Sequence, residues 1–155
     1  MSTSGMLGGK WGEDAEQRAR DLGLRCQQWL PWDEACGFEL CADQEKQVTH
    51  YGHPATLYLI RRQGKLEAVQ LRFRRDDAVW RDVRAGAEKE FGLKKPAAAD
   101  DGLYQVFKDR SLVRLMKEPP QSMLLTVAGP RFGAFYSDRL LSLGAAGSLN
   151  SLSAH

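Results

Sequence analysis

The sequence predicts an α+β fold in which two helix-strand-strand-strand repeats build one antiparallel sheet, with both helices on one face. Two observations favour this fold. A tryptophan is followed, after ten residues, by an apolar residue and a glycine at two places, first from Trp11 to Gly23 and again from Trp80 to Gly92. Three strand-like runs follow each of these segments. Because the turns between the runs are short, we expect the strands to pair in antiparallel fashion.

The first helix is expected at residues 13–22, where acidic residues occupy the first turn and Gly23 follows. The second is expected at residues 77–91, with Asp76 as the N-cap and Gly92 as the stop. Its apolar positions recur at helical spacing, as Trp80, Val83, Ala87 and Phe91.

The strand-like runs of the first repeat are residues 38–43, 56–62 and 66–73, and those of the second are residues 104–109, 111–117 and 123–127. Gln63 and Gly64 have the character of a tight hairpin turn. Residues 44–55 have no counterpart in the second repeat, so the pattern predicts an insertion there.

The length of 155 residues is typical of one compact domain. We expect that domain at residues 11–143, with repeat one at 11–75, repeat two at 76–128 and a last helix at 131–143. Small polar residues dominate both ends, so residues 1–10 and 144–155 are expected to be flexible.

The predicted layout resembles two families. Tandem units of a helix and antiparallel strands resemble the β-lactamase inhibitor protein, and single units resemble the small lipoprotein of the outer-membrane β-barrel assembly machinery. The resemblance covers the order of elements and no specific motif. It implies a non-enzymatic binding protein and assigns no residue a role.

Composition excludes several classes of protein. The hydrophobic fraction is 43% and the charged fraction 27%, as in a soluble globular protein. A net charge of only +2 gives no drive toward nucleic acid. No apolar run approaches the roughly 20 residues of a membrane span, and no signal peptide is evident. We expect a cytoplasmic protein, or one of the cell envelope if a targeting segment was removed.

All three cysteines lie within residues 24–41, at positions 26, 36 and 41. Structural zinc sites are usually built on two cysteines separated by two to four residues, and no such pair is present. Reduced core cysteines would need no function. In an exported chain one disulfide is expected, and a Cys26–Cys41 bond would close the longest loop among the nearby alternatives.

Two groups of residues have the chemistry of protein interfaces. Trp29 and Trp32 flank Pro31 in a loop, where an aromatic side chain can act as an interface anchor or can cap the core. Arginines gather around the hairpin at residues 61–75, where they would form a cationic sheet face or an ordinary solvated one. The arginines expected to contact a partner are Arg61, Arg62, Arg72 and Arg74.

The sequence therefore predicts a non-enzymatic protein-interaction domain, an inhibitor, adaptor or assembly factor, whose partner is another protein. We expect no metal, no cofactor and no catalytic residues. One alternative is a secretion-type chaperone, whose order of elements is similar although such chaperones tend to be acidic. Another is a thiol-dependent enzyme that uses Cys36 or Cys41 with His50 or His53.

Overall fold

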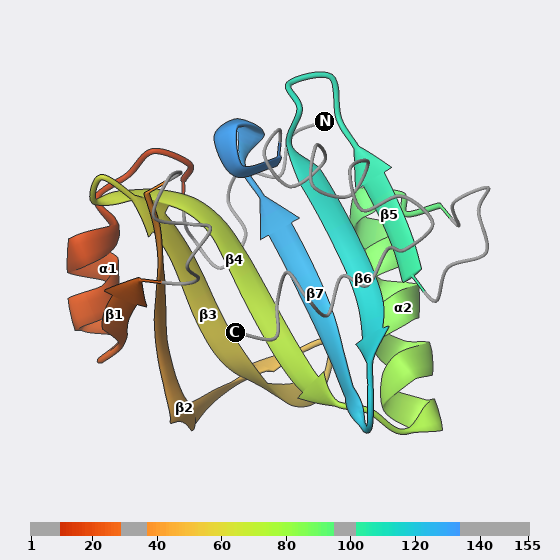
Figure 1. The fold of residues 1–155 in the computed structure, drawn as a ribbon. Helices are drawn as coiled ribbons and strands as arrows, with labels where there is room; N and C mark the ends of the chain where they lie inside the picture. The colour runs from red at the N-terminus through yellow and green to blue at the C-terminus, as the bar shows by residue number, and fades with distance from the viewer. Residues whose placement is uncertain (1–9, 29–36, 95–101, 134–155) are drawn as a thin grey trace.

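The computed structural model describes residues 10–28, 37–94 and 102–133 of the chain. These residues form one layer of β-strands and two helices, α1 and α2, besides a single helical turn at residues 130–133 (Figure 1). The elements in chain order are α1 (Ala15–Asp21), β1 (Arg25–Gln28), β2 (Phe38–His50), β3 (His53–Arg62), β4 (Lys65–Arg74), α2 (Asp77–Phe91), β5 (Gly102–Val106), β6 (Leu112–Glu118) and β7 (Ser122–Ala128).

The seven strands form a single sheet in the order β1-β2-β3-β4-β7-β6-β5. Every neighbouring pair is antiparallel. The centre of the sheet is the pair β4–β7, in which Leu71 lies opposite Leu125. Strands β1 and β5 therefore form the two edges, at opposite sides of the sheet in Figure 1.

The predicted α+β fold of two helix-strand-strand-strand repeats is wrong. The described part of the chain is mostly β, and its strands do not divide into two equal sets. Four strands follow α1 and three follow α2. Residues 44–55, which the sequence predicts as an insertion, are part of the long hairpin of β2 and β3, and β1 is a strand that the sequence does not predict. The resemblance to families with tandem repeats loses its basis with this correction.

The two tryptophans that suggested the duplication also differ in their surroundings. Trp11 precedes α1, in a turn, and its ring lies against Gly129, where a β-carbon would approach it within 2.7 Å. Trp80 lies inside the first turns of α2, half-buried, with the Lys117 ammonium 4.7 Å from the centre of its ring. A shared spacing between tryptophan and glycine therefore does not correspond to a shared structure.

The helices form where local signals favour them. Asp76 accepts a hydrogen bond from the Val79 backbone N–H at 2.8 Å, and Gly92 ends α2 with φ at +67°, a conformation that glycine adopts without steric cost. In α1, Asp14 caps the N-terminus by accepting from the backbone N–H groups of Glu16 and Gln17. The bounds predicted for α2 are thus confirmed, whereas α1 is shorter than predicted.

The core has two parts, one on each face of the sheet. Both helices contribute to the larger part, in which Ala19 of α1 and Phe91 of α2 pack with the buried residues of the central strands. The smaller part, on the other face, includes Phe38, Ile60 and Phe132. The rings of Phe38 and Phe132 meet edge to face at 5.0 Å. Both helices therefore cover the same face of the sheet.

Several sequence predictions concern smaller features. The tight turn between β3 and β4 is confirmed, because Gln63 and Gly64 join the strands with φ of +52° and +74°. The last helix predicted at 131–143 is described only as far as residue 133, where residues 130–133 are helical. The ends predicted to be flexible lie outside the described residues, apart from residue 10. No helix in the described ranges is long and apolar enough to cross a membrane.

Candidate functional site

The two edges of the sheet differ in what covers their backbone groups. On the outer side of β5, the backbone N–H and C=O of Tyr104 bond to Lys94 at 3.0 and 3.2 Å. On the outer side of β1, no element of the described residues pairs with the strand. An edge strand of this kind presents unpaired N–H and C=O groups to any extended chain that approaches it. The edge at β1 is therefore the candidate functional site.

Strand β1 is fixed to the sheet by its pairing with β2 and by a covalent bond. Cys26 lies directly opposite Cys41, and a disulfide joins their side chains. Cys41 is fully buried in the core, whereas Cys26 is only partly shielded. A strand of four residues makes few ladder hydrogen bonds, so the disulfide holds the register that those bonds alone would hold weakly. Cys36 lies outside the described residues.

Helix α1 leads into this edge through a short connection. The chain leaves the helix at Leu22, and Gly23 turns it with φ at +68°. The Lys46 ammonium of β2 donates to the Leu22 carbonyl at 2.6 Å, which satisfies a group left without a partner at the end of the helix. A positive charge at this position is also favourable beside the negative end of the helix.

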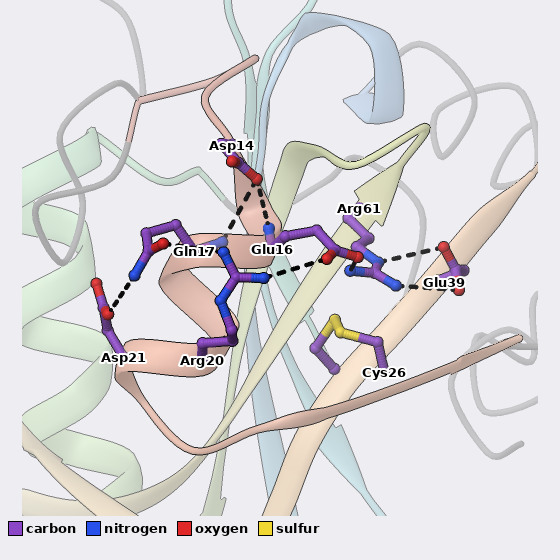
Figure 2. A network of polar contacts seen from close by, with 9 residues as sticks. Asp14, Glu16, Gln17, Arg20, Asp21, Cys26, Glu39 and Arg61 are labelled. Atoms are coloured by element: carbon purple, nitrogen blue, oxygen red, sulfur yellow. Dashed lines mark hydrogen bonds and ion pairs between the residues drawn. A yellow bond between two sulfur atoms is a disulfide. The ribbon is translucent and has the colours of Figure 1, made fainter.

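Arg61 of β3 connects three elements beneath the edge (Figure 2). Its guanidinium donates through Nη1 to Glu16 of α1 at 2.6 Å, and through Nε and Nη2 to Glu39 of β2 at 3.2 and 3.3 Å. Burial alone lowers the pKa of Arg61, but the hydrogen bonds and charges of the two carboxylates outweigh it and raise that pKa. Arg61 therefore stays charged and ties α1 to the strands on which β1 rests.

The structure does not bring the four predicted arginines into one cationic surface. Arg61 faces α1, whereas the Arg62 guanidinium lies over the ring of Phe38 at 5.5 Å. Arg72 and Arg74 lie two residues apart on β4, opposite Leu124 and Ser122 of β7, so they share one face of the sheet. Arg74 is exposed.

Arg72 is occupied by an internal network on the face of the sheet opposite the helices. Its guanidinium donates to both carboxylate oxygens of Glu118, at 2.9 and 3.3 Å, and to the hydroxyl of Tyr58 at 2.8 Å. Burial lowers the pKa of Arg72, and the bonds and charge of Glu118 and Tyr58 more than compensate. A bidentate pair of this kind positions the strands and leaves fewer donors for a partner.

Trp29 and Trp32 lie outside the described residues. Their place in the chain is nevertheless defined at both ends, because Gln28 at the end of β1 pairs with Glu39 near the start of β2. Only these flanking residues are described, and they belong to the paired strands β1 and β2. No sequence signal could have identified Arg61 as the link below this edge, because Glu39 and Glu16 lie 22 and 45 residues away along the chain.

The thiol-enzyme alternative requires a cysteine and a histidine in contact. Cys41 lies opposite Leu59 in β3, and His53 lies six residues earlier in the same strand. At about 3.3 Å per residue these positions are about 20 Å apart. The side chains of Cys41 and His53 are therefore not brought together. No group of histidine, cysteine and acidic side chains within the described ranges has the arrangement of a metal site.

Comparison with known proteins gives no match, because no protein-family model, curated protein or solved structure is significantly similar to this chain.

Proposed function

We propose that this chain is a non-enzymatic protein-interaction domain that binds an extended segment of another protein along the outer edge of β1. The observation that supports this proposal is the contrast between the edges, since Lys94 occupies the outer side of β5 whereas no described element pairs with β1. Addition of a strand to a sheet edge is a common mode of peptide recognition, in which the main chain supplies the hydrogen bonds.

The edge alone would bind weakly. In an antiparallel ladder, alternate residues direct their backbone groups outward, so the four residues of β1 offer about two such positions. Each hydrogen bond contributes about 0.5–1.5 kcal/mol net. Side-chain anchors must therefore supply most of the affinity, and Trp29 and Trp32 follow β1 directly in the sequence. Tryptophan is enriched among the residues that dominate interface energetics.

The contacts that hold β1 in place favour binding, because they reduce the conformational entropy that the edge loses when a partner binds. The disulfide fixes β1 against β2, and Arg61 fixes β2 against α1. A surface that already has its bound conformation loses less conformational entropy on association. Arg25 and Gln27 are exposed on β1, and they would lie beside an added strand.

The test begins with capture of a partner from the native cells on the immobilised full-length protein, followed by titration of that partner in pure form. We expect Trp29→Ala or Trp32→Ala to weaken binding about 30-fold, which corresponds to about 2 kcal/mol. We also expect the amides of β1 to exchange more slowly with deuterium when the partner is bound. Val106→Ser is the matched control, because Val106 is exposed on the opposite edge strand.

The proposal would be overturned if both tryptophan variants bound as tightly as the wild type and the partner left exchange at β1 unchanged. Equal weakening by Val106→Ser would indicate that the β5 edge is used instead. Capture of a protein without these two effects does not support the proposed site.

A further inference from the structure

The tip of the β2–β3 hairpin is held against α2, at the end of the hairpin away from the residues that pair with β1. Tyr51 and Gly52 form its two-residue turn, with φ of +51° and +81°. Turns with two positive φ values favour asparagine and glycine, and a bulky aromatic residue rarely adopts this conformation. Residues held in such conformations persist where their surroundings stabilise them. The contacts of Tyr51 with α2 are therefore needed to keep the turn in this form.

The hairpin tip contacts three residues of α2 that are spaced one helical turn apart. The ring of Tyr51 lies on Gly86, where a methyl group would overlap it, and the Tyr51 hydroxyl donates to the carboxylate of Glu90. His53 Nε2 lies 2.9 Å from the Asp82 carboxylate. Burial, the bond to Glu90 and the charge of Glu90 all raise the pKa of Tyr51, so its hydroxyl remains a donor.

His50, at the same hairpin tip, has a ring nitrogen without a hydrogen-bond partner. Its Nε2 atom is buried and has no hydrogen-bond partner, and its ring packs on that of Tyr51 with centroids 4.2 Å apart. A neutral imidazole tolerates this position, because one of its ring nitrogens carries no N–H and therefore needs no acceptor. A protonated imidazole carries an N–H on both nitrogens, and a buried N–H with no acceptor is costly.

We propose that the tip of the β2–β3 hairpin is a pH-controlled latch on α2, closed while His50 is neutral and released when His50 takes up a proton. Protonation makes it favourable for the His50 ring to turn toward water. Tyr51 is its neighbour in the chain and in packing, so the same movement withdraws the Tyr51 ring from Gly86. The face of α2 that carries Asp82, Gly86 and Glu90 then becomes accessible.

Burial and a nearby charge have opposite effects on the pKa of His50. Burial lowers the pKa of His50, and the charge of Glu90 opposes that effect without cancelling it. The docked tip therefore binds fewer protons than the released tip, and it loses stability as the pH falls below 6.5. His53 Nε2 and the Arg81 guanidinium both contact the Asp82 carboxylate, so the tip also has a polar contact that does not involve His50.

The experiment is a pH titration of the full-length protein by NMR, from about pH 7.5 to about pH 5, where histidine is the ordinary side chain that changes charge. The readout is the nuclear Overhauser contact between the Tyr51 ring and the Gly86 α-protons. We expect the wild type to lose this contact by the end of the titration and His50→Gln to retain it. His53→Gln should also lose the contact, because His50 is unchanged in that variant.

Retention of the contact by the wild type throughout would overturn the latch, as would its loss from His50→Gln at the same pH as from the wild type. Amides of Val69 and Val127, which pair at the centre of the sheet, report on global unfolding. If they lose protection together with the contact, the transition is unfolding of the whole domain and the latch is wrong.

Discussion

The two helices are attached to the same face of the sheet by different kinds of contact. Helix α1 has seven residues, of which only Ala15 and Ala19 are buried. Its attachment is largely polar, through the backbone bond from Ala15 to Gly64 at 2.8 Å and the ion pair between Glu16 and Arg61. Helix α2 has fifteen residues and buries Val83, Ala87 and Phe91.

This difference indicates how each end of the sheet is stabilised. Two alanines remove little apolar area from water, whereas a phenylalanine and a valine together contribute several kcal/mol. The end of the sheet at α1 and β1 therefore depends on a disulfide and on charged hydrogen bonds, and the end at α2 depends on packing. Because covalent and ionic contacts respond to reductant, salt and pH, the two ends should respond differently to the same treatment.

The largest expected effect is the loss of packing under α2. Phe91→Ala removes a ring that is 6% exposed, and it should lower the free energy of unfolding by about 3–5 kcal/mol, as removal of buried aromatic side chains does. Chemical denaturation followed by circular dichroism measures this change. The matched variant is Trp80→Ala, whose larger ring is only half-buried beneath Lys117. It should cost about half as much, and an equal cost would show that the burial of α2 has been misjudged.

The next effect tests the covalent link at the other end. Replacement of Cys26 and Cys41 together by alanine should lower the free energy of unfolding by about 3 kcal/mol, the value for a closed loop of about 15 residues in the chain-entropy model. Wild-type protein treated with reductant should lose a similar amount. Hydrogen exchange should accelerate in β1 and leave α2 unaffected. An equal denaturation midpoint for oxidised and reduced wild type would contradict this prediction.

The same contrast explains which parts of the fold the sequence predicted. The bounds of α2 could be predicted because its signals are local, an N-cap at Asp76 and a glycine at position 92. The first helix was predicted to begin at residue 13, but it begins at Ala15 because Asp14 provides the cap. Strand β1 has the sequence RCQQ, without apolar alternation, so only its pairing with β2 makes it a strand.

The error in fold class has a similar origin. Residues 44–55 carry charges, a glycine and a proline, so they do not show the alternating pattern of a half-buried strand. They nevertheless form the half of the β2–β3 hairpin nearest its turn, because Val48 and Thr49 pair with Ala55 and Pro54. For the candidate site, the sequence predicts which types of side chain are present but not which side chains contact one another. Whether an arginine is paired with a carboxylate depends on residues distant in the sequence.

A smaller effect on stability is expected from the ion pairs, and it should differ between the pair of α1 and the pair of α2. Arg61→Met should lower the free energy of unfolding by about 1–2 kcal/mol, because the Arg61 side chain is only 12% exposed and bonds two carboxylates. The matched variant is Arg84→Met, which removes a half-exposed pair with Glu88 on the surface of α2. That pair should contribute about 0.3–0.5 kcal/mol. A double-mutant cycle with Glu39→Gln measures the coupling of Arg61, and a coupling as small as that of Arg84 would contradict the proposed role.

The smallest expected effect has the opposite sign and concerns Glu67 of β4. Its side chain is 4% exposed, and the Arg131 guanidinium lies 3.6 Å away. Burial raises the pKa of Glu67, although the charges of Arg131 and Arg62 oppose it. The folded protein therefore binds a proton more readily than the unfolded chain does, so the stability contributed by this group is present at acidic pH and is lost as the pH rises through the folded pKa.

Replacement of Glu67 by glutamine removes the charge and retains the shape. Glu67→Gln should therefore raise the free energy of unfolding at pH 7 by about 1 kcal/mol or less, and the gain should disappear below about pH 4.5, the unperturbed pKa of the group. Denaturation midpoints at the two pH values measure the change. Glu118→Gln is the matched control, because Glu118 is also buried but holds Arg72 through both of its oxygens. That variant should lose stability at pH 7, and a gain in both variants would show that burial outweighs pairing throughout the sheet.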